Sequence, residues 1–144
     1  MLTRMQLDLS GLEHATYSLS SALTVLKAPD ADTRYTVEER EAMRAGVILW
    51  CQLSYDLGCS LMQRRLELDL DMEPGTHIPR IDLFRVAESN GVIASSAPWF
   101  DHFAARNRIA RAHDRWQAEM VFADAATLHR DVEALLANLQ ARND

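Results

Sequence analysis

The residues best suited to chemistry gather in one short segment, Arg106 to Arg115, of this 144-residue chain. The segment holds four arginines and one aspartate, whereas the whole chain has a formal net charge of −6. Arginine can hold a phosphate through two parallel hydrogen bonds, and histidine can exchange a proton near neutral pH. Arg106 and His113 could therefore cleave RNA without a metal, with the imidazole deprotonating the 2′-hydroxyl and the guanidinium stabilising the charge that develops at phosphorus.

The spacing of these two residues decides whether they can act together. Arg106 and His113 are seven apart, so on one helix they point in nearly the same direction. Trp99, Phe103 and Ala110 share that line, which predicts a mostly buried stripe. Because a buried charge needs a partner, the pair should be satisfied inside the protein or face a cleft or a second chain. One copy supplies one imidazole, so a symmetric dimer would bring together the two that acid and base steps favour.

An exposed, solvated position is the alternative for this pair, because arginine and histidine at this spacing are common on helix surfaces. His113 would then pair with Asp114 or another surface acid. The other arginines, Arg108, Arg111 and Arg115, are candidates for further phosphate contacts, provided that they share a face.

The remaining reactive residue types do not form a pattern that indicates a site. His14, His77, His102 and His129 are scattered, and no pair has the i, i+4 spacing with a third ligand that a zinc site needs. The chain has no glycine-rich phosphate loop and no nucleophile elbow. We therefore expect neither a metal nor another cofactor.

The two cysteines, Cys51 and Cys59, lie in a segment that we interpret as helix. Their spacing there places them about 12 Å apart, beyond the reach of a disulfide. We expect both to be buried as small apolar residues.

Length and composition bound the class of protein. The chain has the size of one domain, residues 1–144, and its 48% apolar content suits a globular protein. The N-terminal residues lack an apolar run of signal-peptide length, and no stretch approaches the roughly 20 apolar residues that span a bilayer. A cytoplasmic location without membrane contact is therefore the default expectation. The negative net charge argues against a generally basic nucleic-acid binder, although a local basic site can still bind RNA or a nucleotide.

The apolar periodicity predicts an all-α protein with four long helices and one short helix in an antiparallel bundle. Thr36 and Glu39 form a T-x-x-E capping box at the start of the second helix. Pro79 suits the first turn of the short helix, and Asn90-Gly91 suits its end. The expected helices are Met5–Lys27, Thr36–Leu70, Pro79 to Asn90-Gly91, Ser95 or Ser96 to Arg115, and a last helix from near Asp124 with Leu128, Val132, Leu135 and Leu139 on one face.

The stretch from about Ala45 through His113 resembles the HEPN superfamily, and most closely its nucleotidyltransferase substrate-binding branch. The resemblance is carried by three blocks, which are Val47–Leu57, Ile81–Ala87 with the following Asn90–Ile93, and Trp99 followed by Arg106-Asn107 and His113.

The resemblance implies a helical bundle that dimerises around the motif helix. It implies Arg106 and His113 as the catalytic pair in members that are metal-independent ribonucleases, with Asn107 as a positioning residue. It also implies a partner, a small nucleotidyltransferase that is commonly encoded alongside and acts as antitoxin in toxin–antitoxin pairs.

The sequence departs from the family pattern near the histidine. Many members carry a tyrosine two residues after it, which the partner can modify with adenylate, whereas this chain carries Arg115. That mode of neutralisation is therefore in doubt here. The interval between Arg106 and His113 is also longer than in the close branch, so Arg108 competes as the motif arginine; helical geometry favours Arg106.

Two functions follow, and the sequence favours the first. The first is a toxin, an endoribonuclease that uses Arg106 and His113 of two subunits. The second is a non-catalytic subunit that docks on a small nucleotidyltransferase and helps it to hold a nucleotide or another anionic substrate. A plain interaction bundle is a third, weaker interpretation.

Overall fold

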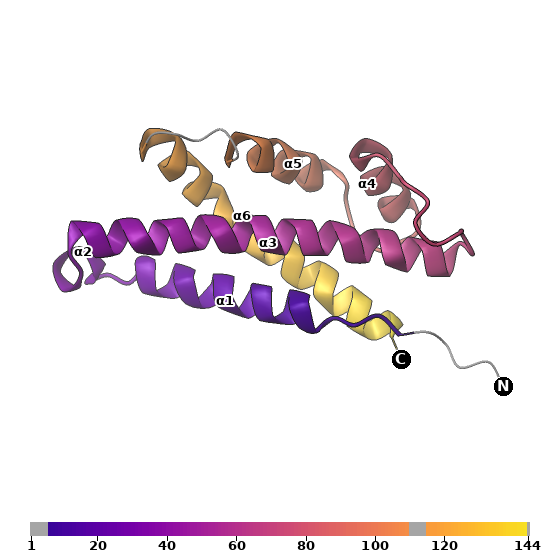
Figure 1. The fold of residues 1–144 in the computed structure, drawn as a ribbon, viewed down its shortest axis with the longest axis horizontal. Helices are drawn as coiled ribbons and strands as arrows, with labels where there is room; N and C mark the ends of the chain where they lie inside the picture. The colour runs from indigo at the N-terminus through magenta and orange to yellow at the C-terminus, as the bar shows by residue number, and fades with distance from the viewer. Residues whose placement is uncertain (1–5, 110–114, 144) are drawn as a thin grey trace.

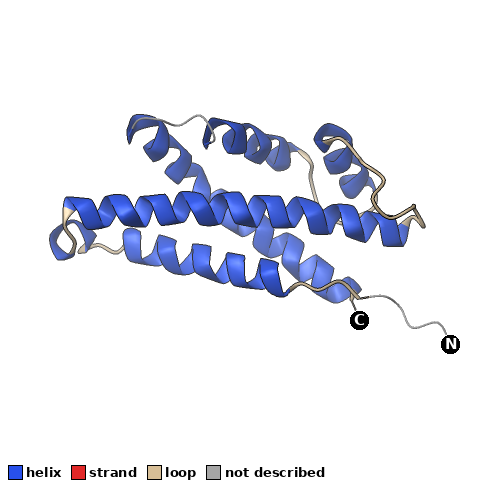
Figure 2. Ribbon diagram, viewed as in Figure 1, coloured by secondary structure: helices blue, strands red, loops and turns tan. Residues whose placement is uncertain are grey.

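The computed structural model describes the backbone of residues 6–109 and 115–143 and the side chains of residues 6–108 and 124–143. Over this part of the chain the structure contains six α-helices and no strand, so the all-α prediction is confirmed. Figure 2 shows these helices joined by loops. None of the described helices is long and apolar enough to cross a membrane. The helices are α1 (Ser10–Leu26), α2 (Ala31–Arg34), α3 (Val37–Asp69), α4 (Arg80–Ser89), α5 (Ala97–Ile109) and α6 (Arg115–Arg142).

The long helix α3 is the centre of the bundle (Figure 1). Helices α1 and α6 both pack against α3 and also touch each other. Helices α4 and α5 lie along another side of α3, and α5 also packs against α6. Because the chain runs along α3 and returns along α5, residues near the end of α5 come to lie beside the middle of α3.

The core is formed largely by apolar residues of α1, α3 and α6. Leu12 and Leu19 of α1 and Val47 of α3 are completely buried. The four apolar residues expected on one face of the last helix, Leu128, Val132, Leu135 and Leu139, are all buried.

The first helix begins at Ser10, so the predicted start at Met5 is wrong. Asp8 blocks an earlier start, because its Oδ1 accepts hydrogen bonds from the Ser10 backbone N–H at 3.0 Å and the Ser10 hydroxyl at 2.7 Å. Tertiary contacts also hold the preceding segment. The Leu7 backbone pairs with the Asn143 side chain in both directions, at 3.1 and 2.9 Å.

The last helix begins at Arg115, so its predicted start near Asp124 is wrong, and Arg115 does not close the preceding helix. The residues from 115 to 123 contain neither glycine nor proline, and nothing among them interrupts a helix. An aspartate can cap a helix, but it does not have to. Residues 110–114, which we expected in the helix of Arg106, lie outside the described residues.

Two helix boundaries are confirmed by their caps. The Thr36 hydroxyl accepts from the Glu39 N–H, and the Glu39 carboxylate accepts from the Thr36 N–H, each at 3.0 Å. Helix α4 follows Pro79 and ends at Asn90, where Gly91 takes a φ of +72°. That left-handed conformation suits glycine, and it allows the Val92 N–H to bond back to Ala87 at 2.9 Å.

Candidate anion-binding site on α5

Trp99 sets the rotation of α5. Its side chain is 2% exposed and packs on the rings of Phe84 and Tyr55, with ring centroids 5.9 and 6.4 Å away. Gly58 of α3 lies against the ring, since a Cβ there would be in ordinary van der Waals contact with Trp99 at 3.7 Å. With Trp99 turned inward, Arg106, seven residues later, also faces the bundle rather than open solvent.

Arg106 reaches from α5 to Asp56 in the middle of α3. Its Nε and Nη2 donate to the two carboxylate oxygens of Asp56 at 3.4 and 3.3 Å. The side chains are 31% and 50% exposed. The Arg106 guanidinium therefore forms a two-point ion pair within the protein. Its hydrogen bonds are long, and both side chains remain partly exposed to water.

Arg108 and Asn107 point elsewhere. Arg108 Nη2 donates to Asp124 Oδ2 of α6 at 3.4 Å, and both side chains are more than half exposed. Asn107 is exposed. Arg106 and Arg108 therefore both lie near the C-terminal end of α5, but they pair with acidic residues on different helices, α3 and α6.

The other predicted site residues fall outside the described parts of the structure. Arg111 and His113 belong to residues 110–114, and only the backbone of Arg115 is described, in the first turn of α6. The pairing of Arg106 with His113 therefore stays a prediction.

Sequence reasoning missed a buried histidine one turn before Arg106. His102 Nε2 and Asp131 Oδ2 of α6 are hydrogen-bonded at 2.6 Å, with side chains 4% and 17% exposed. The imidazole also meets the Trp99 ring edge-on at 5.5 Å. The sequence offered one signal for this residue, because His102 lies three residues after Trp99 and so shares the buried face of the helix. Nothing in the sequence indicated its partner Asp131, which is 29 residues away.

A pocket of about 270 Å³ opens beside this histidine, between α5 and α6. Its polar lining includes Asp101, His102, Arg108, Asp124 and Thr127. The described residues contain no cluster of three groups that could hold a metal ion. Among the described residues, the pocket therefore offers a polar ligand one exposed cation, Arg108, which pairs with the exposed carboxylate of Asp124.

The cysteines do not take part in this chemistry. Cys51 and Cys59 are free and buried, as expected. Burial raises the pKa of the Cys51 thiol to about 12 and that of Cys59 to about 11. Both thiols therefore stay protonated at neutral pH and are poor nucleophiles.

Comparisons with known proteins give the family and the fold of this chain. A family described as nucleotidyltransferase substrate binding protein like matches residues 7–141. The solved structure of HI0074 from Haemophilus influenzae, described as the fold of a substrate binding domain of a nucleotidyltransferase, superposes with a TM-score of 0.87. At 22% identity, the match covers 92% of this chain and 99% of that one. A comparison with curated proteins finds no match. The chain belongs to the nucleotidyltransferase substrate binding protein like family, as the resemblance of its helices and motif predicted.

Proposed function

We propose that this chain is a non-catalytic substrate-binding subunit that docks on a small nucleotidyltransferase. The observation that carries the proposal is that Arg106 and Arg108 are held only by exposed ion pairs. Each pairs with one exposed carboxylate at 3.3–3.4 Å, and neither contact is buried. Exposed ion pairs of this kind contribute only about 0–1 kcal/mol, so an anionic substrate can replace the carboxylates at little cost.

Membership in the family supports the same function, because the family is described by substrate binding rather than by catalysis. The position of the arginines supports it as well. Both lie near the C-terminal end of α5, where Arg106 extends toward α3 and Arg108 toward α6. The two guanidinium groups can therefore approach a ligand from two sides. That arrangement suits a phosphate or another multivalent anion held between subunits.

The proposal is tested by co-expressing the chain with a candidate small nucleotidyltransferase from the same genome. We expect the two proteins to elute as one complex in size-exclusion chromatography with light scattering. The double variant Arg106→Gln/Arg108→Gln should still form the complex but bind nucleotide at least about tenfold more weakly, since two charge-assisted contacts are lost. The matched control is Arg85→Gln, which removes an exposed arginine from α4. Separate elution of the two proteins would overturn the proposal.

A metal-independent ribonuclease toxin is the second candidate. It is favoured by the order Arg106, Asn107, His113 in the sequence, which matches the catalytic motif that the family resemblance implies. A growth experiment distinguishes the ribonuclease toxin from the substrate-binding subunit. The wild type and His113→Ala are each expressed alone in bacteria, and growth and RNA integrity are followed. Growth arrest with RNA cleavage by the wild type alone supports the toxin, whereas equal growth with intact RNA removes it.

A further inference from the structure

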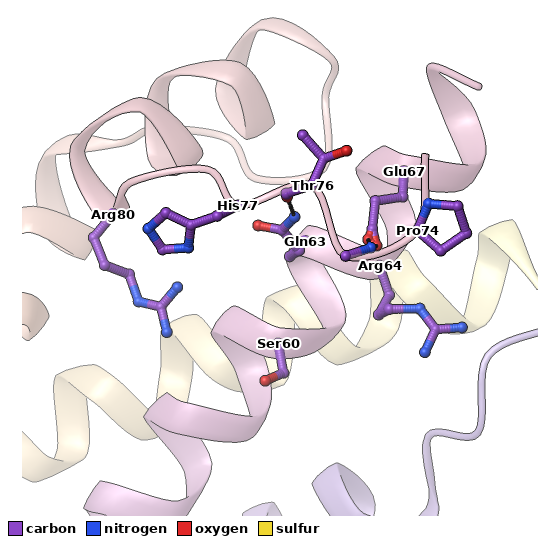
Figure 3. A pocket seen from close by; sticks show the side chains of 9 residues that line it. Ser60, Gln63, Arg64, Glu67, Pro74, Thr76, His77 and Arg80 are labelled. Atoms are coloured by element: carbon purple, nitrogen blue, oxygen red, sulfur yellow. Dashed lines mark hydrogen bonds between the residues drawn. The ribbon is translucent and has the colours of Figure 1, made fainter. Parts of the chain in front are cut away.

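A second pocket, of about 590 Å³, lies between the C-terminal half of α3 and the segment that leads into α4 (Figure 3). Its volume is in the range of small-molecule sites. The nearest lining residue on α3, Ser60, is one helical turn beyond Asp56, so this pocket adjoins the Arg106 site but has its own lining. The lining residues are Ser60, Gln63, Arg64 and Glu67 of α3, Pro74, Gly75, Thr76 and His77 of the connecting segment, and Arg80 of α4.

Hydrogen bonds hold the connecting segment against α3. The Gln63 side chain donates to the Thr76 carbonyl, the interaction drawn as a dashed line in Figure 3. Glu67 is 5% exposed, and both of its carboxylate oxygens accept from the Gly75 N–H, at 3.3 Å each. Gly75 has a φ of +84°, which a glycine adopts without strain. The wall of the pocket is therefore formed before any ligand arrives.

The pocket concentrates positive charge in an acidic protein. Arg64, His77 and Arg80 line it, and none of the described carboxylates forms an ion pair with Arg64 or Arg80. The single carboxylate in the lining, Glu67, is turned toward Gly75. In Figure 3, Arg80 and His77 are drawn toward one end of the lining, and Arg64 toward the other end, beyond Gln63.

Arg80 is held partly inward. Burial raises the pKa of the Tyr55 and Cys59 side chains, and the positive charge of Arg80 opposes that rise in both. Its half-buried guanidinium therefore lies near the buried side chains of Tyr55 and Cys59. A cation in such surroundings gains more from an anionic ligand than a fully hydrated one does.

We propose that this pocket binds the phosphate ester of a small, hydroxyl-rich molecule. The phosphate lies between Arg80 and His77, because an arginine fork and an imidazole can donate to different oxygens of one phosphate. The volume exceeds that of a phosphate alone, so an organic body is also bound. Among the described residues, no Phe, Tyr or Trp lines the pocket to stack on a base, whereas Ser60, Gln63 and Thr76 offer hydrogen bonds to hydroxyls.

The test is a titration of the isotope-labelled full chain, followed by amide NMR shifts, with ribose 5-phosphate, inorganic phosphate and ribose as probes. We expect saturable shifts in residues 60–80 with ribose 5-phosphate, weaker binding of inorganic phosphate, and none of ribose. Absence of saturation, or equal binding of ribose, would overturn the proposal. Because binding is measured on this chain alone, the result does not depend on a nucleotidyltransferase partner.

Variants identify the residues responsible. Arg80→Gln should raise the Kd for ribose 5-phosphate about tenfold, and Arg80→Lys should raise it less, since the charge remains but the fork is lost. Arg85→Gln is the matched control; it removes an exposed arginine of the same helix that lies over the Phe100 ring instead of the pocket. If Arg80→Gln does not fold, Arg64→Gln, at an exposed position of α3, should raise the Kd about threefold. An equal effect of Arg85→Gln would show that binding follows net charge rather than this pocket.

Discussion

The acidic partners of the α5 arginines decide how available those arginines are. Asp56 holds Arg106 with both oxygens, but at distances above 3.2 Å and with half of its own side chain in water. Asp124 holds Arg108 in the same loose way. These carboxylates orient the guanidinium groups in the free protein, and an incoming anion must displace them.

Removing the carboxylate of Asp56 should therefore strengthen anion binding. We expect Asp56→Asn to lower the Kd for adenosine monophosphate about threefold, because Arg106 keeps its place but loses a competing charge. The free energy of unfolding should change by less than about 1 kcal/mol, as for other exposed ion pairs. Calorimetric titration and urea unfolding measure the two quantities. Asp32→Asn is the control, because Asp32 pairs with Arg40 away from the site; weaker binding by Asp56→Asn would contradict the displacement argument.

The buried pair of His102 and Asp131 should matter for stability. Asp131→Ala leaves a buried ring nitrogen without its 2.6 Å partner, so the free energy of unfolding should fall by about 1–3 kcal/mol. Asp131→Asn retains a hydrogen-bonding side chain of the same shape and should lose less. Urea unfolding gives both values, with the exposed neighbour Asp101→Ala as the reference. A loss no larger than that of Asp101→Ala would mean that the pair contributes little to folding.

At the scale of the elements, the ends of the helices are set by a few local devices. The capping box of Thr36 and Glu39 starts α3, and Gly91 ends α4. The Gly91 position is crowded as well as left-handed, since a Cβ there would lie 3.3 Å from Arg142 Nη2. That nitrogen in turn donates to the Asn90 carbonyl at 2.8 Å, which ties the end of α4 to the last turn of α6.

Two glycine substitutions should therefore have opposite signs. Gly91→Ala forces a side chain into the left-handed region, so thermal or urea unfolding should show a loss of about 1–2 kcal/mol. Gly46→Ala in the middle of α3 meets nothing within 4 Å and should gain about 0.5–1 kcal/mol, because alanine loses less backbone entropy in a helix. Unchanged or increased stability of Gly91→Ala would show that the end of α4 does not need glycine.

At the scale of the whole molecule, α3 leaves large apolar side chains in water. Leu49 and Leu53, one turn apart on α3, are 51% and 38% exposed. Side chains at i and i+4 share one face of a helix, so the two leucines form a small apolar ridge. An exposed apolar ridge of this kind is suited to contact with another chain.

We predict a homodimer, with a mass by light scattering of twice the 16.3 kDa of the chain at micromolar concentration. Leu53→Glu should shift the equilibrium toward monomer, because it places a charge on the apolar ridge. Tyr17→Glu is the control, since Tyr17 is 72% exposed on α1. A monomeric wild type would remove both the dimer and any active site built from two copies.

Much of this molecule could be predicted from local information. The stripes of apolar residues predicted the helices and most of the core, and Thr36 with Glu39 marked a helix start to the residue. The arginine-rich segment pointed to α5 as a candidate anion site, which stays a prediction. Each of these features depends on side chains within one or two helical turns, so the order of residues alone contains it.

Tertiary packing decided the rest. The partner of Arg106 is 50 residues away in the chain, and that of His102 is 29 residues away. The pocket of Arg80 and His77 exists because the segment before α4 is held against α3 by Gln63 and Glu67. The start of the first helix likewise depends on a contact between Leu7 and Asn143. Residue order records which groups are present, but which of them meet depends on how helices rotate and pack against one another, and no local pattern specifies that.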